Sequence, residues 1–214
     1  MIRVLLVDDH QIVLDGLKSI LEKNTEMEVL GCLADSREAL ILTGHLVPDV
    51  VIMDISMRGL NGIEATRRIK AEVPQVQVLC VSMHSDPEFV GAMLRAGASG
   101  YLLKEDTGDM LVDAIKTVIQ GRNFLSPGIS NSIIEFFRDG FQESVSPFQV
   151  LSNREREVLQ LIAEGQSTRD ISGVLHISER TVGSHREKIK LKLGISSIAG
   201  LTRYALQHGL TQLD

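Results

Sequence analysis

The N-terminal part of the chain alternates two patterns of hydrophobic and polar positions. Short apolar runs rich in β-branched residues are typical of strands buried on both faces of a sheet. These runs lie at 2–7, 28–33, 49–53, 76–81 and 100–103. Between them, apolar positions recur at helical spacing, in stretches at about 11–22, 36–46, 62–71, 87–96 and 107–120. Five such repeats predict an α/β fold: a five-stranded, parallel, doubly wound sheet with helices on both faces.

From residue 151 onward the pattern is purely helical, which predicts an all-α domain of four helices. The helical stretches lie at 153–164, 168–175, 179–193 and 197–208. Gly165 and Gly194 stand where helices would end, because glycine accepts the left-handed conformation of a helix C-terminus. Three serines stand where a side-chain oxygen can cap a first helical turn: Ser152, Ser167 and Ser178.

The stretch between these two patterns is predicted to be a linker. Gly121 closes the fifth predicted helix, and Pro127 and Pro147 disfavour a long regular element beyond it. A short helix is expected over Ile129–Arg138. A chain of 214 residues favours two domains. The predicted organisation is a first domain at 1–121, a linker at 122–149 and a second domain at 150–214.

Composition places the chain among ordinary globular proteins, with 43% hydrophobic and 23% charged residues. No apolar run approaches the roughly 20 residues that cross a bilayer. The apolar N-terminal run stops at Asp8 and Asp9, unlike a signal peptide. We therefore expect a cytoplasmic protein with no membrane partner. Cys32 and Cys80 lie in apolar, strand-like segments, where reduced thiols are expected rather than a disulfide or metal pair.

The net charge of −6 is unevenly distributed. Residues 1–149 carry 13 Lys and Arg against 21 Asp and Glu, whereas residues 150–214 carry 9 against 7. Within the second group, Arg180–Lys192 holds five basic residues and a single acid, Glu187. This concentration fits either a helix that faces nucleic-acid phosphates or a solvated helix face, and charge alone does not choose between them.

Acidic residues end two of the predicted strands: Asp8 and Asp9 follow the first, and Asp54 follows the third. If these strands are neighbours, the carboxylates converge at the carboxyl edge of the sheet, where open α/β sheets bind ligands. Two carboxylates about 4 Å apart repel by roughly 4 kcal/mol at an effective dielectric of about 20. Such an arrangement needs a cation or shifted pKa values. Oxygen ligands favour Mg²⁺, which would align a phosphoryl group on an acid oxygen.

Two further polar residues end strands at the same edge. Ser82 ends the fourth strand and can hydrogen-bond a phosphoryl oxygen, while Lys104 follows the fifth and can pair with one. Taken singly, each has an ordinary explanation: Asp9 as a helix N-cap, Ser82 as a turn residue and Lys104 as a surface lysine. Their shared position at the carboxyl edge of the sheet favours a common phosphoryl site.

Residues 1–121 resemble the receiver domain of two-component systems, a flavodoxin-like fold, most closely over Val50–Ile69. The resemblance implies that Asp54 accepts a phosphoryl group from a phosphohistidine on a sensor histidine kinase. The chain departs from the family pattern at Arg58 and Glu105, where receivers commonly have proline. These departures put in doubt the rigidity of the loop and the lifetime of the phosphate, because proline would fix φ there.

The same resemblance implies a metal site and a phosphate-binding switch. The Mg²⁺ ligands would be Asp9, Asp54 and the main-chain carbonyl of Ser56, with Asp8 acting through water. The residues that bind the phosphate and carry the switch would be Ser82, Lys104 and Tyr101. Tyr101 also fits as an amphipathic aromatic at a strand end, which needs no switch.

The C-terminal stretches Leu151–Leu159 and Ile177–Arg186 resemble the LuxR-type helix-turn-helix, and the match continues through Gly194. Together the two halves resemble a response regulator of the NarL/FixJ class. The resemblance and the amphipathic pattern imply that the helix at 179–193 packs its apolar side on the other helices and offers its polar side to the major groove of DNA. The DNA-contacting residues would be Arg180, Thr181, Gly183, Ser184, Glu187, Lys188 and Lys190.

Gly183 and Glu187 depart from the longer polar residues common at these positions. Gly183 costs roughly 1 kcal/mol of helix stability against alanine and offers no side chain to a base. Glu187 can accept a hydrogen bond from cytosine but is repelled by phosphate. We therefore expect modest DNA affinity per subunit and dependence on a dimer. Lys190 and Lys192 are expected to contact phosphates or solvent.

The leading hypothesis is a response regulator, not an enzyme, in which phosphorylation of Asp54 promotes homodimer formation and binding to promoter DNA. RNA polymerase is a further candidate partner. A Mg²⁺-dependent phosphohydrolase with Asp54 as nucleophile is a second hypothesis, but the acid that would activate water and a substrate pocket are not visible in the sequence. A third is a DNA-binding protein whose receiver acts without phosphorylation, a possibility that Arg58 keeps open.

Overall fold

The computed structural model of the chain describes residues 1–130, 133 and 150–211. The described residues fold into two compact units, of which one contains the β-sheet and the other contains the helices near the C-terminus. Each unit has its own hydrophobic core. The two units are therefore described separately.

The first unit is built on a parallel sheet. Its strands are β1 (Ile2–Val7), β2 (Met27–Leu33), β3 (Val50–Met53), β4 (Gln77–Ser82), β5 (Gly100–Leu103) and β6 (Phe124–Leu125). Their spatial order is β2-β1-β3-β4-β5-β6. Val7 of β1 is in register with Met53 of β3, so the residues that follow them, Asp8 and Asp54, leave neighbouring strands at the same edge. This confirms the arrangement on which the sequence-based site depends.

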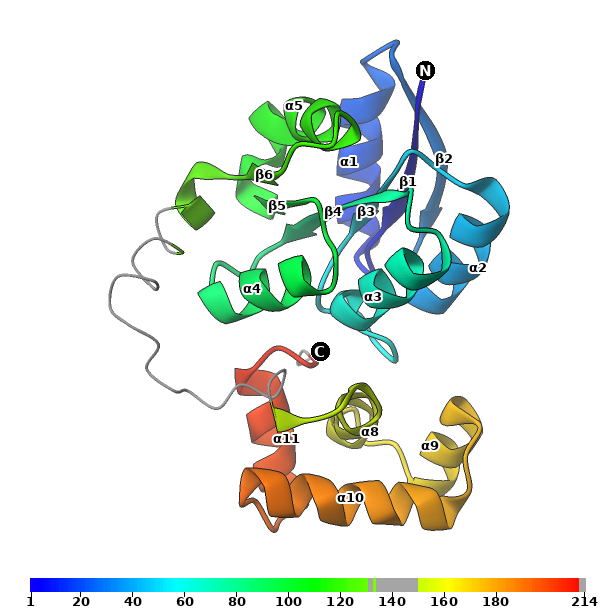
Figure 1. The fold of residues 1–214 in the computed structure, drawn as a ribbon, viewed down its shortest axis with the longest axis vertical. Helices are drawn as coiled ribbons and strands as arrows, with labels where there is room; N and C mark the ends of the chain where they lie inside the picture. Colours follow the sequence, from blue (N-terminus) through cyan, green and yellow to red (C-terminus); the bar gives the residue numbers. More distant parts are fainter. Residues whose placement is uncertain (131–132, 134–149, 212–214) are drawn as a thin grey trace. The chain divides into compact units, whose positions relative to one another are not determined.

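Five helices cover this sheet. They are α1 (Gln11–Glu22), α2 (Ser36–Leu46), α3 (Gly62–Glu72), α4 (Pro87–Arg95) and α5 (Thr107–Ile119), and a 3-10 turn at Lys104–Asp106 precedes α5. Figure 1 shows α1 and α5 on one face of the sheet and α2, α3 and α4 on the other. The doubly wound parallel fold predicted from the sequence is confirmed, and every helix boundary lies within one residue of the predicted one.

The prediction of five strands is wrong by one short edge strand. Beyond α5 the chain turns at Gly121, whose φ of 75° lies in the left-handed region that glycine accepts. It then runs parallel to β5, and β6 pairs with Gly100 and Tyr101. Two residues are too few to show a periodicity, which is why the pattern did not reveal this strand. Of the short helix expected over Ile129–Arg138, most lies outside the described residues.

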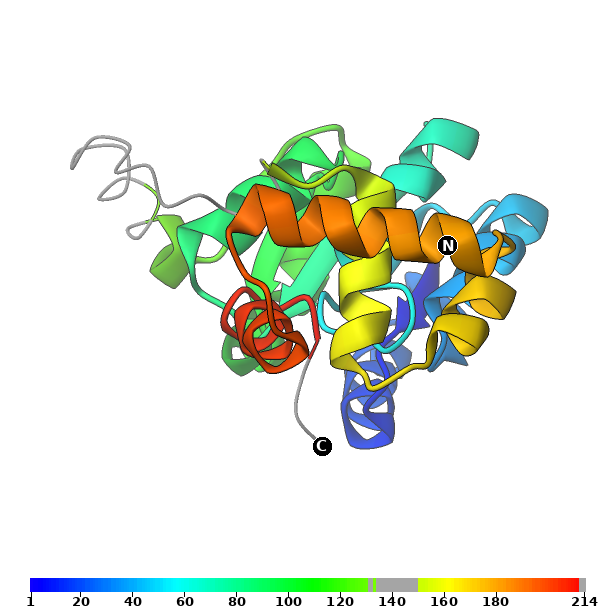
Figure 2. The ribbon, with the colours of Figure 1, turned by 90° about the horizontal axis from the view of Figure 1, so that it is seen from below.

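Residues 150–211 of the second unit contain four complete helices. They are α8 (Asn153–Ala163), α9 (Thr168–Leu175), α10 (Glu179–Leu193) and α11 (Ile198–Gln207). Figure 2 shows α10 crossing α8, and α10 also packs on α9. The buried side of α10, with Val182 and Ile189, joins Val158 and Ile171 in one apolar cluster, as its amphipathic pattern predicts. The polar side of α10 is left exposed.

Local capping explains where these helices begin and end. The hydroxyls of Ser152, Ser167 and Ser178 each accept a hydrogen bond from a main-chain N–H in the first turn of the helix that follows, as predicted. Gly165 and Gly194, with φ of 79° and 67°, adopt the left-handed conformation just beyond α8 and α10. The boundaries of the recognition helix candidate, α10, are thus set by local sequence.

None of the helices among the described residues combines the length and the apolar character that crossing a bilayer requires. Cys32 and Cys80 are both free thiols, as their position in strands led us to expect.

Candidate functional site

Three charged side chains meet at the carboxyl edge of the sheet. Asp8 and Asp54, which follow β1 and β3, are almost fully buried, at 1% and 3% exposure. Lys104, which follows β5, lies between them: its Nζ is 2.6 Å from Asp8 Oδ2 and 3.1 Å from Asp54 Oδ1. The lysine therefore neutralises part of the repulsion between the two carboxylates, and the structure brings these sequence-predicted residues together.

Burial dominates the electrostatics of Asp54. Desolvation raises the pKa of its carboxyl group to about 6, against the opposing attraction of Lys104 and with a smaller contribution from the charge of Asp8. Burial also opposes the charged form of Lys104, but the carboxylates of Asp54 and Asp8 together raise the pKa of the lysine above its ordinary value. Such shifts are characteristic of functional carboxylates in clefts.

Asp9 and His10 extend this site. His10 donates its main-chain N–H to Asp8 Oδ1 at 2.9 Å, and its Nδ1 lies 2.9 Å from Asp9 Oδ1. Asp9 Oδ1 is buried and makes no hydrogen bond of acceptable geometry. Ligand atoms of Asp8, Asp9 and His10 all lie within 4.8 Å of one another. A buried, unsatisfied carboxylate oxygen beside a second acid fits a divalent cation with oxygen ligands.

The loop after Asp54 is folded closely against it. The main-chain N–H of Ser56 donates to Asp54 Oδ2 at 3.0 Å, and that of Gly62 donates to the carbonyl of Ile55 at 2.8 Å. A Cβ at position 62 would lie 1.8 Å from the carbonyl oxygen of Asp54, so only glycine fits there. Gly62, which the sequence analysis did not single out, thus lets the start of α3 approach the loop that follows Asp54.

The side chains of Ser82 and Tyr101 both form hydrogen bonds with the main chain of His84. Tyr101 is fully buried, and its hydroxyl donates to the carbonyl of His84 at 2.7 Å. The hydroxyl of Ser82 accepts from the main-chain N–H of His84 at 3.2 Å. Burial raises the pKa of Tyr101 well above its ordinary value. Tyr101 is therefore more than an aromatic at a strand end, because its polar tip is held in the loop after β4.

His84 is a residue that the sequence analysis missed. Its Nε2 lies 2.7 Å from the hydroxyl of Ser56, and its ring stacks on Phe89 of α4 with centroids 4.6 Å apart. Burial lowers the pKa of His84. The sequence holds no motif for the contact with Ser56, since it joins residues 28 positions apart in two loops.

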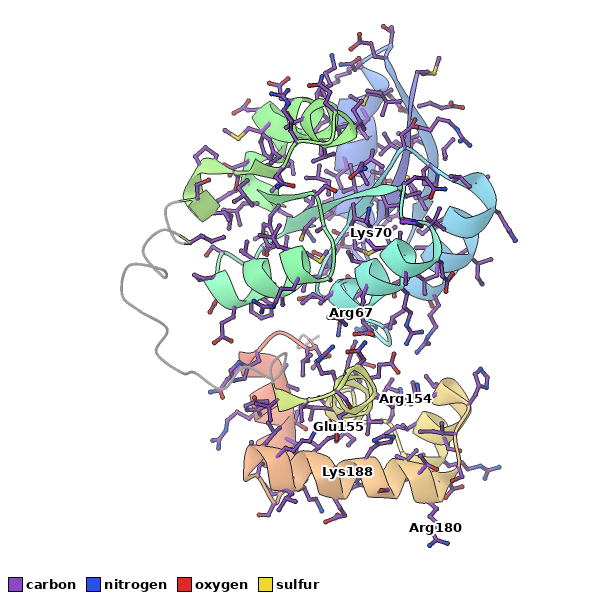
Figure 3. All side chains as sticks on the ribbon, viewed as in Figure 1. Arg67, Lys70, Arg154, Glu155, Arg180 and Lys188 are labelled. Carbon is purple, nitrogen blue, oxygen red and sulfur yellow. The ribbon has the colours of Figure 1, made fainter. Side chains whose placement is uncertain are left out.

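In the second unit, the polar side of α10 carries the residues predicted to contact DNA. Arg180, Ser184 and Lys188 are exposed, and Figure 3 shows Arg180 projecting away from the N-terminal end of the helix. Thr181 is part of the cap, with its hydroxyl 2.8 Å from that of Ser178. A Cβ at Gly183 would meet nothing within 4 Å, so this position is an open spot on the surface of the helix.

Two lysines of α10 have partners within the unit. Lys190 pairs with Glu187 at 2.8 Å on the surface. Lys192, expected to contact phosphate or solvent, instead binds Glu155 of α8 at 2.7 Å. Burial opposes the charge of Glu155, but Lys192 and the cap residue Ser152 lower the pKa of Glu155 below its ordinary value. Lys192 therefore joins α10 to α8, because a carboxylate enclosed at the start of α8 needs a counterion.

Comparison with known protein families agrees with this division. Residues 4–116 match the response regulator receiver domain family, and residues 149–205 match the luxR family of bacterial regulatory proteins. The first match covers more than half of the chain and contains every residue of the acidic site. The second contains α8, α9 and α10 entirely.

Several known proteins are similar over nearly the whole chain. The transcriptional regulatory protein MctR of Rhizobium johnstonii is 40% identical over 98% of this chain and 95% of the relative. The transcriptional regulatory protein DegU of Brevibacillus brevis is 39% identical over 91% of this chain and 89% of the relative. The chain therefore belongs to the NarL/FixJ-class response regulators, two-component proteins that join a receiver domain to a LuxR-type DNA-binding domain.

A solved structure is also similar over nearly the whole chain. The response regulator RcsB of Salmonella enterica serovar Typhimurium, bound to the promoter rprA in the presence of the phosphomimetic BeF3⁻, is 27% identical with a TM-score of 0.66. The match covers 95% of this chain and 97% of that one. The class of the protein is thus a DNA-binding transcription regulator of a two-component system.

Proposed function

We propose that a sensor histidine kinase phosphorylates Asp54, and that this phosphorylation controls homodimer formation and sequence-specific binding of promoter DNA. One observation carries the proposal: Asp54 is buried beside a second acid and a lysine at the carboxyl edge of the sheet. A buried carboxylate so placed can act as a nucleophile toward a phosphoryl group, while the lysine offsets the charge that arrives. The transfer forms a bond between an oxygen of Asp54 and phosphorus and breaks the phosphorus–nitrogen bond of the donor histidine.

The residues at this edge suit a magnesium ion. Asp9, Asp54 and the main-chain carbonyl of Ser56 would hold Mg²⁺, with Asp8 acting through water. When bound, the ion would neutralise phosphoryl oxygens and orient the donor. The unsatisfied oxygen of Asp9 and the enclosed carboxylate of Asp8 support this assignment.

Lys104 and Ser82 would bind the phosphoryl oxygens. The Lys104 ammonium already lies within ion-pair distance of Asp54 and can pair with the phosphoryl group on it. The Ser82 hydroxyl can donate to another phosphoryl oxygen. Because the loop after Ser82 also holds the hydroxyl of Tyr101, movement of Ser82 would alter the surface formed by α4 and β5. This change would bias an existing equilibrium toward a form that dimerises.

The second unit would bind DNA through α10 in the major groove. Two such units in a dimer would engage half-sites about one helical turn apart. Contacts are proposed for Arg180, Thr181, Gly183, Ser184, Glu187, Lys188 and Lys190. We also propose domains at 1–121 and 150–214 with a linker at 122–149, a cytoplasmic location and RNA polymerase as a further partner.

Labelling of the full chain by radioactive acetyl phosphate tests the phosphoacceptor. With Mg²⁺ present, the wild-type chain should become labelled, and chelation of the metal should prevent it. Asp54→Ala should abolish the label, whereas Asp15→Asn, which removes an exposed acid on α1, should retain it. Persistent stoichiometric labelling of Asp54→Ala would refute the assignment.

A further inference from the structure

His84 makes contacts in four directions, although it stands in a loop. Its main-chain N–H donates to Ser82 Oγ at 3.2 Å, and its carbonyl accepts from the hydroxyl of Tyr101 at 2.7 Å. Its Nε2 lies 2.7 Å from Ser56 Oγ, and its ring stacks on Phe89 at an interplanar angle of 23°. A loop residue held by both its main chain and its side chain can transmit displacement rather than absorb it.

These contacts form a continuous path from the phosphoacceptor. Asp54 Oδ2 accepts from the main-chain N–H of Ser56 at 3.0 Å, and the hydroxyl of the same serine bonds His84. His84 then contacts Phe89 in α4 and Tyr101 in β5. Each link is a hydrogen bond or a ring stack between residues of the first unit. The path reaches the α4 and β5 side through the loop after Asp54, and so differs from one that begins at Ser82.

We propose that His84 is a positioning residue, and that its hydrogen bond to Ser56 couples the phosphoacceptor loop to Tyr101 and α4. This inference rests on the proposed phosphorylation of Asp54. When a phosphoryl group is added to Asp54, the Ser56 peptide that hydrogen-bonds its carboxylate must adjust. The bond to His84 passes this adjustment to the loop that holds Tyr101.

The chemistry of position 84 allows the coupling to be separated from simple packing. A phenylalanine there keeps a flat ring that can stack on Phe89 but removes the hydrogen bond to Ser56. Ser56→Ala removes the same hydrogen bond from the other side and keeps the main-chain N–H and carbonyl at the acidic site. If the bond itself carries the coupling, His84→Phe and Ser56→Ala should have the same effect, and combining them should add little.

The test uses the full chain labelled with 3-fluorotyrosine and observed by ¹⁹F NMR. The chain has two tyrosines, so Tyr204→Phe assigns the signal of Tyr101. Beryllofluoride with Mg²⁺ serves as the phosphoryl mimic. In the wild-type chain this addition should shift the Tyr101 signal. In His84→Phe, in Ser56→Ala and in the double variant, the shift should fall by about half or more, to a similar extent in all three.

Acetyl phosphate labelling is measured alongside. His84→Phe should still be labelled, which separates a loss of coupling from a loss of phosphorylation. A wild-type Tyr101 shift in His84→Phe would overturn the inference and leave the proposed function intact. Independent, additive losses in the two single variants would also overturn it, because the hydrogen bond would then not be the link. A wild-type chain that neither labels nor responds would overturn both.

Discussion

The acidic edge of the sheet and the polar side of α10 hold their charges in opposite environments. At the acidic edge of the sheet, the side chains of Asp8, Asp54 and Lys104 are 2%, 3% and 11% exposed. On α10, Glu187 is 73% exposed and its partner Lys190 is 27% exposed. Buried charges interact strongly and each depends on its neighbours, whereas exposed charges are screened and contribute little singly. Chemistry at one carboxylate suits the first environment, and recognition of DNA spread over many contacts suits the second.

The largest effect is expected from Lys104→Met. Removing the lysine leaves Asp8 and Asp54 buried without a cation, which should lower the free energy of unfolding by about 3–5 kcal/mol. The matched control is Lys18→Met, which breaks an exposed ion pair in which Lys18 Nζ lies 3.7 Å from Glu22 Oε1. Its loss should lower the free energy of unfolding by less than about 1 kcal/mol. Urea denaturation of the full chain without metal measures both. Equal effects of the two variants would contradict the contrast between buried and exposed charges.

Asp54→Asn should raise the free energy of unfolding, whereas Lys104→Met lowers it. The pKa of Asp54 is raised to about 6 in the folded chain, so the folded state binds this proton more tightly than the unfolded state does. The charged carboxylate therefore lowers the free energy of unfolding. The loss is complete above about pH 6 and absent below about pH 4. The amide should stabilise the metal-free chain by up to about 3 kcal/mol at pH 7.5, with the gain vanishing as the pH falls to 4. Urea denaturation at several pH values, compared with Asp15→Asn, measures this; a gain independent of pH would contradict the assignment.

Arg180→Ala should show how an exposed charge acts. If the guanidinium contacts DNA, its loss should weaken binding about tenfold. The slope of the logarithm of affinity against the logarithm of salt concentration should become shallower by about 1. The probe is DNA selected from a random pool by the wild-type chain, and binding is titrated at several salt concentrations. Lys23→Ala, an exposed lysine of the other unit, is the control and should leave the affinity unchanged. Arg180→Ala should leave the stability of the chain nearly unaltered, unlike Lys104→Met.

The smallest effect is expected at Gly183. Because a Cβ there would meet nothing within 4 Å, Gly183→Ala should raise the stability of the helical unit by about 0.5–1 kcal/mol through helix propensity alone. Gly173 of α9 has equally open space, so Gly173→Ala is the matched comparison. Urea denaturation followed by circular dichroism measures both. A loss of stability at position 183 would show that its surface is not open.

Sequence alone predicted the same kind of feature in both units. The helices, the five longer strands and the caps follow from local patterns, and the residues at strand ends could be assigned to one edge because parallel strands order them. Contacts between loops could not be predicted: His84 acquires its role only when the fold brings it to Ser56, 28 positions away. The pair of Lys192 with Glu155 was missed for the same reason, since periodicity shows which side of a helix is polar but not which partner it meets.

Control of DNA binding by Asp54 is tested most directly by the affinity of the full chain for its selected DNA, before and after treatment with acetyl phosphate and Mg²⁺. The phosphorylated wild-type chain should bind much more tightly than the untreated chain or the fragment 150–214. Asp54→Ala should show no response to the phosphodonor. Equal affinities of the fragment and the phosphorylated chain at one salt concentration, or an equal response of Asp54→Ala, would contradict it.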